Sequence, residues 1–188
     1  MSGLQRCGAL AVACLAVLAG CATPGQRPVP VTPEAARIEN VPFFPDDTDQ
    51  CGPSTLASVL SFWDRPTPPD VLRSEIYLPN IKGTLPMDLL PAVESRGLKA
   101  TVTNGTLEDL QRHVREGRPV LAYFDLGLAM VTRGHYVVVT GFDGEGIHAH
   151  SGKKPDSRIS YRKLERIWGR TDRWMLVVEG PAEEKQTP

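Results

Sequence analysis

The chain has 188 residues, a formal net charge of −1 at pH 7, 41% hydrophobic residues and 23% charged residues. This length suits one domain with tails, and this composition is ordinary for a globular protein. The charge is close to zero and no basic stripe is visible, so there is no electrostatic reason to expect nucleic acid. We therefore predict one folded domain without a nucleic-acid partner.

The first 21 residues have the pattern of an export signal that ends in a modified cysteine. After Arg6, residues 7–20 are small and apolar without charge, which is short for a membrane span but typical of a signal-peptide core. The segment ends in Leu18-Ala19-Gly20-Cys21, which resembles the bacterial lipobox. This resemblance implies a signal peptide over residues 1–20 and lipid on Cys21; an ordinary secretory signal is the alternative.

The lipobox also predicts where the protein resides. A lipidated Cys21 would anchor it in the bacterial cell envelope, and Ala22, rather than an aspartate, gives no inner-membrane retention signal. We expect the outer membrane, with the domain facing the periplasm. Residues 21–37 then form a tether rich in proline, and a domain over residues 38–179 is followed by a flexible tail over residues 180–188.

The cysteine count makes one thiol stand out. The four cysteines are Cys7, Cys14, Cys21 and Cys51. Two leave with the signal peptide and one carries lipid, so Cys51 would be the single free thiol of the mature chain. In an oxidising compartment this excludes an internal disulfide framework, and an unpaired cysteine there is usually absent or reactive.

The domain begins with helical patterns. Residues 37–44 indicate a short strand, and Gln50-Cys51-Gly52-Pro53 then passes directly into an apolar helix over residues 51–64. Pro53 fits the first helical turn. Cys51 would lie at the positive end of the helix dipole, among unsatisfied N–H groups that favour a thiolate. Cys51 is therefore either a small buried side chain or a nucleophile.

The remaining elements follow in chain order. Helices are expected over residues 70–76, 87–96 and 106–115, the last with a capping box between Thr106 and Asp109, and over residues 161–168 with Ser160 as cap. Strands are expected over residues 98–103, 119–124, 135–142, 147–151 and 174–178, with a hairpin turn over residues 143–146. Helices first and a mostly antiparallel sheet second predict an α+β fold.

A thiol nucleophile needs a base, and His135 is the candidate. It opens a buried strand directly after Gly134, 84 residues after Cys51. A histidine there is more often structural, but the upstream cysteine reverses that expectation. His113 lies on the polar face of a charged helix. His148 and His150 share a strand face without an evident third metal ligand, so we interpret them as surface histidines.

The order of these motifs resembles a known peptidase family. A cysteine at a helix start followed by a histidine at a strand start resembles the papain-like cysteine peptidases. The segments Val41-Pro42-Phe43-Phe44, Gln50-Cys51-Gly52-Pro53 and residues 134–144 look like the bacteriocin-processing family, which cleaves double-glycine leader peptides. Residues 77–79, 82–85 and 150–152, with Trp168 and Trp174, resemble its stand-alone lipoprotein members. The resemblance implies a papain-like fold with the nucleophile helix packed on the sheet.

Two positions depart from this family. The family commonly has a glutamine, an oxyanion donor, five or six residues before the cysteine, where this chain has Pro45 and Asp46. An ionised carboxylate would repel an oxyanion, so Gln50 and the backbone N–H of Cys51 are the candidate donors instead. The third catalytic residue is usually Asp or Asn sixteen positions after the histidine, where this chain has Ser151. Asp143 is too far along its strand to replace it.

Strand parity supports Ser151 as the partner of His135. If Ser151 faces inward, so do Ala149 and Ile147, and the two histidines between them face outward. A serine hydroxyl can hold the imidazole but brings no charge to stabilise imidazolium.

The sequence thus predicts a lipid-anchored cysteine peptidase with catalytic Cys51, His135, Ser151 and Gln50, acting on a peptide or protein. No cofactor or metal is implied, and a transporter or envelope partner would be a separate protein. Two alternatives use the same fold: a peptide-binding module without turnover, and a thiol acyltransferase or cell-wall peptide hydrolase.

Overall fold

The computed structural model describes residues 35–46, 49–128 and 130–181. The predicted signal peptide, Cys21 and most of the tether lie outside these residues, as does the tail beyond residue 181. Within the described ranges, no helix has both the length and the apolar character needed to cross a bilayer.

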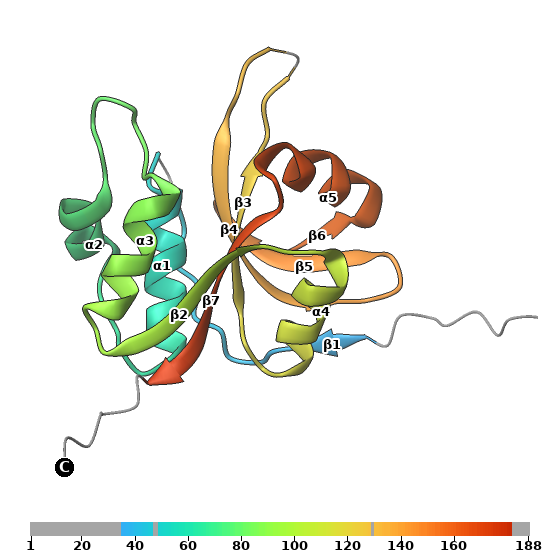
Figure 1. Cartoon of the computed structure of the whole chain (residues 1–188), viewed down its shortest axis with the longest axis horizontal. Helices are drawn as coiled ribbons and strands as arrows, with labels where there is room; N and C mark the ends of the chain where they lie inside the picture. Colours follow the sequence, from blue (N-terminus) through green and yellow to red (C-terminus); the bar gives the residue numbers. More distant parts are fainter. Residues whose placement is uncertain (1–34, 47–48, 129, 182–188) are drawn as a thin grey trace, which may run out of the picture. The chain divides into compact units, whose positions relative to one another are not determined.

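The domain has three layers (Figure 1). One face of the sheet is covered by three helices, α1 (Cys51–Phe62), α2 (Pro69–Ile76) and α3 (Pro86–Glu94). The opposite face is covered by α4 (Leu107–Arg115) and α5 (Tyr161–Trp168), after which a short 3-10 helix, η1 (Gly169–Thr171), leads to the last strand. The predicted α+β arrangement, with helices before most of the sheet, is confirmed.

The sheet has seven strands in the order β2-β7-β3-β4-β5-β6, with β1 paired to the end of β4. All these pairings are antiparallel. The strands are β1 (Ala36–Arg37), β2 (Leu98–Asn104), β3 (Val120–Asp125), β4 (Gly134–Phe142), β5 (Gly146–Ser151), β6 (Lys154–Ser160) and β7 (Trp174–Pro181). The central strand β4 carries the expected base, His135, at its first positions.

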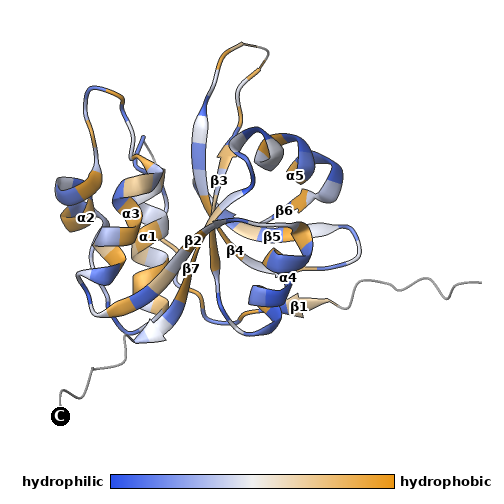
Figure 2. Ribbon diagram, in the orientation of Figure 1, coloured by the Kyte–Doolittle hydropathy of each residue, from blue (hydrophilic) through white to orange (hydrophobic). Residues whose placement is uncertain are grey.

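Burial on both faces explains why β4 is apolar along its length. Tyr136 and Val138 pack against α1, whereas Val137 and Val139 pack on the side of α4 and α5. Helix α1 is buried from Gly52 to Leu60, because it lies between the sheet and α2 and α3. Figure 2 shows hydrophobic residues concentrated on α1, α3 and the central strands of the sheet. The nucleophile helix is therefore a core element.

Most expected helices form with small shifts at their ends. Thr106 accepts a hydrogen bond from the Asp109 N–H and Asp109 accepts one from the Thr106 N–H, so the predicted capping box is confirmed. Ser160 occupies the N-cap position of α5, but its side chain makes no capping bond. That detail of the prediction was wrong.

Three strand predictions need correction. The strand expected over residues 37–44 is only Ala36–Arg37, because Asn40 adopts a left-handed φ of 58° and prolines follow at 42 and 45. Strand β6 was not predicted, since it is a polar, mostly exposed edge strand that contains Pro155. The sheet also extends through Gly180 and Pro181, which pair with β2, so the chain is ordered beyond the expected start of the tail.

Candidate active site

Cys51 is the first residue of α1, and its thiol is free and half-buried. The hydroxyl of Thr55 donates to the Cys51 carbonyl at 2.6 Å, which fixes the first helical turn. The next residue has to be glycine, because a Cβ on Gly52 would lie 2.5 Å from Thr84 Oγ1. Tyr136 Oη in turn donates to the Thr84 carbonyl at 3.0 Å. The loop around Thr84 is thus packed directly against the turn that carries the thiol.

Cys51 and His135 line one cleft of about 700 Å³. One wall is the segment Ile81–Pro86, and the other wall includes Thr132, Arg133 and Gly134 at the start of β4. These wall residues belong to two connections that Figure 1 shows as tall loops, one between α2 and α3 and one between β3 and β4. Both side chains therefore belong to the same cleft.

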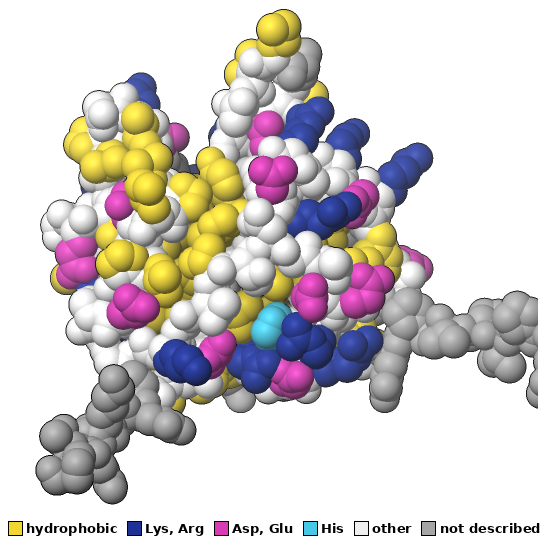
Figure 3. Space-filling view, viewed as in Figure 1, with side chains coloured by type: hydrophobic (Ala, Val, Ile, Leu, Met, Phe, Trp, Pro, Cys, Tyr) yellow, Lys and Arg dark blue, Asp and Glu magenta, His cyan; other side chains and the backbone are white. Residues whose placement is uncertain are grey.

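An apolar hollow of about 480 Å³ adjoins the cleft and shares Leu85 and Pro86 with it. Its other lining residues are Met87, Leu90, Val102 and Trp174. Figure 3 shows hydrophobic side chains gathered over α3 and the neighbouring strands. Met87 is 72% exposed, so this apolar surface is open to a ligand.

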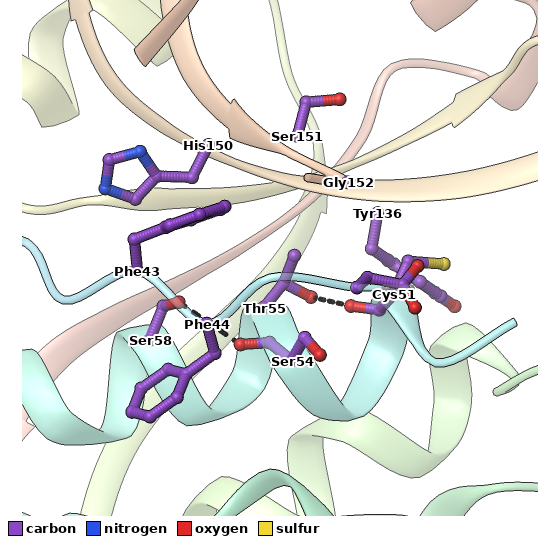
Figure 4. Close-up of a pocket in the computed structure, with 11 residues that line it drawn as sticks. Phe43, Phe44, Cys51, Ser54, Thr55, Ser58, Tyr136, His150, Ser151 and Gly152 are labelled. Atoms are coloured by element: carbon purple, nitrogen blue, oxygen red, sulfur yellow. Dashed lines mark hydrogen bonds between the residues drawn. The ribbon is translucent and has the colours of Figure 1, made fainter. Parts of the chain in front are cut away.

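His135 Nε2 lies 2.9 Å from Ser151 Oγ, the predicted pairing. Figure 4 shows Ser151 and His150 on opposite sides of β5, as strand parity requires. If Nε2 carries the hydrogen and donates to Ser151, the other ring nitrogen, Nδ1, has a lone pair for the thiol proton. The structure therefore brings Ser151 to His135 and places His135 with Cys51 at the cleft, although Ser151 itself does not line it.

Burial controls the ionisation of both reactive groups. Burial raises the pKa of the Cys51 thiol, and the Asp46 carboxylate raises it further, although backbone N–H groups of Tyr136, Gly52 and Cys51 act in the opposite direction. Burial lowers the pKa of His135, with Asp46 raising it and Arg133 lowering it. The expectation that the helix start favours a thiolate was wrong, because desolvation outweighs the helix terminus. Both shifts favour the neutral form of each group, the thiol of Cys51 and the imidazole of His135.

Asp46 is held firmly at the position of the family glutamine. Its Oδ1 accepts the Gln50 N–H at 3.1 Å, and its own N–H donates to the Gly152 carbonyl at 3.0 Å. Asp46 lines the cleft together with Cys51 and His135, whereas Gln50 is not among the lining residues. The role of Gln50 as an oxyanion donor stays a prediction.

A narrow hollow lies behind the nucleophile (Figure 4). Phe43 and Phe44 line it from the segment before α1, and Phe43 packs edge-on against His150 with ring centroids 5.3 Å apart. Ser58, buried in α1, donates to the Ser54 carbonyl at 3.1 Å. These contacts pack against the side of α1 that faces away from the cleft. The Cys51 residue lines both the hollow and the cleft.

The other histidines are half-buried and hydrogen-bonded to protein groups, so they are less exposed than their surface positions in the sequence pattern suggested. His148 lies 2.8 Å from Asp143, and His150 Nε2 donates to the Val41 carbonyl at 3.0 Å. His113 accepts from Arg118 at 3.1 Å. Asp143 lies at the hairpin turn with His148, so it is not the partner of His135. Among the described residues, no group of three or more His, Cys, Asp or Glu could hold a metal ion.

Residues 38–173 match the model of the Peptidase_C39 like family. The chain belongs to the C39-like peptidase family. This confirms the resemblance on which the site was predicted. No curated protein sequence matches the chain.

Solved structures of C39-like peptidases share the fold. One is a C39-like peptidase from Bacillus anthracis, with TM-score 0.66 and 18% identity over 80% of this chain and 100% of that one. A second is a double glycine motif protease from an AMS/PCAT transporter, in complex with a leader peptide. Its TM-score is 0.62, with 23% sequence identity over 78% of this chain and 95% of that one. A third is the peptidase domain of Streptococcus ComA, with TM-score 0.59 and 18% sequence identity over 77% of this chain and 100% of that one. The predicted papain-like fold is thereby confirmed.

Proposed function

We propose that this C39-like family member is a cysteine peptidase that cleaves peptide bonds with Cys51 as nucleophile and His135 as base. The observation that supports it is the cleft that Cys51 and His135 share, together with the contact between His135 Nε2 and Ser151 Oγ. This pairing leaves Nδ1 as the ring nitrogen that can receive the thiol proton. A nucleophile, a base and an orienting group are the parts that acyl transfer through a thioester requires.

The reaction starts from a neutral pair. When a peptide occupies the cleft, His135 Nδ1 removes the proton of Cys51 Sγ as the sulfur attacks the carbonyl carbon. The backbone N–H of Cys51, which has no partner inside the helix, and the Gln50 amide are the proposed donors to the oxyanion. Imidazolium then gives its proton to the leaving nitrogen as the C–N bond breaks, and a thioester remains.

Hydrolysis of the thioester completes the cycle. His135 takes a proton from water, whose oxygen attacks the acyl carbon, and imidazolium returns this proton to the departing Cys51 sulfur. The products are a carboxylic acid and the free thiol. Ser151 keeps the ring oriented through both steps.

The substrate we propose is a peptide or protein with an apolar segment. The apolar hollow beside the cleft can receive such side chains from a chain that crosses the catalytic pair. A solved structural neighbour is a protease in complex with a leader peptide, which supports the same class of ligand here. A transporter or envelope protein is the proposed partner.

Cleavage of peptides by the purified chain tests the activity. Cys51→Ala and His135→Ala should each abolish turnover of a fluorogenic peptide library, whereas His113→Ala should not, because His113 lies on α4 outside the cleft. Turnover that survives Cys51→Ala would disprove the proposal.

We further propose that lipid on Cys21 holds the enzyme at the bacterial envelope, in the outer membrane with the domain facing the periplasm. The lipobox supports this location. Detergent phase partition of the protein made in bacteria, with Cys21→Ser as the comparison, tests it. The variant should move to the aqueous phase; equal partition of both proteins would contradict the anchor.

A second candidate is a peptide-binding module without turnover. The raised pKa of the Cys51 thiol and the carboxylate in place of the family glutamine favour it. Calorimetry on Cys51→Ala and the unchanged chain separates the two functions. Equal peptide affinity of both proteins, with no product formed by either, would establish binding alone.

A further inference from the structure

The imidazolium that forms on His135 needs a negative charge that Ser151 does not provide. Ser151 Oγ holds the ring at 2.9 Å, but a hydroxyl is neutral. The titratable and charged residues that line the cleft with His135 are Asp46, Asp49, Cys51, Lys82, Tyr123, Arg133, Tyr136 and Lys153. Two of them, Asp46 and Asp49, are carboxylates, and they are the candidates for that charge.

Asp46 is tied to both chain segments that carry the catalytic residues. Its N–H donates to the carbonyl of Gly152, the residue after Ser151, at 3.0 Å. Its Oδ1 accepts from the N–H of Gln50, the residue before Cys51, at 3.1 Å. Asp46 also lines the hollow behind the nucleophile together with Ser151. These bonds hold the carboxylate between the helix start and the end of β5.

The electrostatics have the direction that such a role requires. The Asp46 carboxylate raises the pKa of His135 against the effects of burial and Arg133. It also raises the pKa of Cys51, so the thiol keeps its proton until the imidazole takes it.

We propose that Asp46 is a positioning residue that stabilises the His135 imidazolium from within the cleft that both residues line, in place of the carboxylate missing at Ser151. This rests on the proposed proton transfer from Cys51 to His135. In this chain the negative charge near His135 would therefore come from the segment before α1, whereas the family commonly has it at the end of β5, at the position of Ser151. This role would also explain why position 46 is not the family glutamine, because one side chain cannot supply both a negative charge and an amide donor.

Titration of the His135 ring by NMR tests the charge without requiring activity. Asp46→Asn should lower the pKa of His135 when measured in the Cys51→Ala protein. Asn Oδ1 can still accept the Gln50 N–H, so the substitution removes the charge and keeps the loop. Asp49→Asn, at the other carboxylate of the cleft, is the matched control and should leave that pKa unchanged. An unchanged pKa in Asp46→Asn, or an equal change in both variants, would overturn the proposal.

Rescue by relocating the carboxylate is the second test. In the active chain, Asp46→Asn should lower kcat/KM about tenfold, the effect of losing one nearby opposite charge. Adding Ser151→Asp should restore most of that loss, because a carboxylate would then bind His135 directly. Asp46→Gln should also lose activity, although it supplies the amide of the family. Higher activity in Asp46→Gln, or no rescue by Ser151→Asp, would show that Asp46 does not serve His135.

The two tests separate this inference from the proposed function. If the unchanged chain cleaves no peptide, the peptidase proposal fails, but the NMR titration still reports whether Asp46 acts on His135. If the chain cleaves peptides and the pKa of His135 does not change in Asp46→Asn, only the proposed role of Asp46 fails.

Discussion

Cys51 shows how a buried environment can reverse what the local sequence favours. The helix start offers N–H groups and a positive dipole end, yet burial raises the pKa of the thiol. A neutral thiol makes the base indispensable, because attack must coincide with proton transfer to His135. The enzyme we propose is therefore closer to a hydroxyl nucleophile activated by histidine than to a preformed thiolate–imidazolium pair.

The pH dependence of alkylation tests this state of Cys51. In a chain beginning at Ala22, Cys51 is the single cysteine. Its reaction with iodoacetamide should be slow at pH 7 and should rise most steeply above the ordinary thiol pKa of 9.0, because the folded value is raised. Unfolded protein in urea is the control and should react with the pH dependence of a free thiol. A rate that is already maximal near neutral pH in the folded protein would show a lowered pKa instead.

Residue types and spacing were enough to place Cys51, His135 and Ser151 at one site. The spacing of sixteen residues from His135 to Ser151, with strand parity, predicted a contact that is 2.9 Å long in the structure. The ionisation of Cys51 could not be predicted, since its burial depends on packing from β4 and the loop around Thr84. Asp46 was singled out in the sequence, but its bond to Gly152 joins distant parts of the chain and leaves no local pattern.

At the scale of the element, local rules succeeded where a helix had a strong signal. The capping box of α4 was visible in Thr106 and Asp109, and the apolar pattern located α1. Strand β6 had no such signal, because its ladder with β5 holds polar residues on an exposed edge. Hydrophobic periodicity cannot detect a strand in which Ile159 is the one buried residue and most of the others are polar.

The first turn of α1 depends on the glycine after the nucleophile. Gly52→Ala would place a Cβ 2.5 Å from Thr84 Oγ1, and Thr84 is itself buried. We expect a loss of about 1–3 kcal/mol in the free energy of unfolding, the usual cost of overpacking, measured by urea denaturation. The control is Gly169→Ala at the end of α5, where φ is −60° and no atom lies within 4 Å of the new Cβ. Equal stability of the two variants would contradict the close packing at Gly52.

The capping box of α4 should make part of the stability depend on pH. Hydrogen bonds from Arg112 and Thr106 lower the pKa of Asp109 from 3.8 to about 2. The part of the free energy of unfolding that Asp109 contributes is therefore present above pH 3.8 and is lost as the pH falls toward 2. Asp109→Asn should cost about 0.5 kcal/mol at pH 7, because the group is exposed, and the difference should vanish in acid.

Thermal melts from pH 7 downward measure this difference. Glu108→Gln removes a charge from the same turn without touching the capping box, and it is the matched control. If the two substitutions gave the same dependence on pH, the bonds of Asp109 would not be its cause.

At the scale of the whole molecule, the class of fold was predictable but the order of strands was not. Helical patterns followed by strand patterns are typical of an α+β domain, and residues 134–151 form the expected hairpin of β4 and β5. No local pattern shows that β7, the last strand, lies between β2 and β3. β7 thus connects β2, from the early part of the chain, to β3, which pairs with the strand that carries His135.

Removing β7 should therefore unfold the domain. Its residues pair with β2 and with β3, and Met175, Leu176, Val177 and Val178 are buried in the two faces of the sheet. A chain that ends at Arg173 would leave β2 without its partner strand and would expose β3 as an edge.

We expect this truncated chain to show no cooperative thermal transition by circular dichroism. A chain that ends at Pro181 keeps every strand pairing of the described residues and should melt at the temperature of the full chain. Cooperative melting of the chain that ends at Arg173 would mean that the domain folds without β7 and would contradict this prediction. Because the two shortened chains differ by eight residues, all of them in β7, a loss of folding confined to the shorter one can be assigned to that strand.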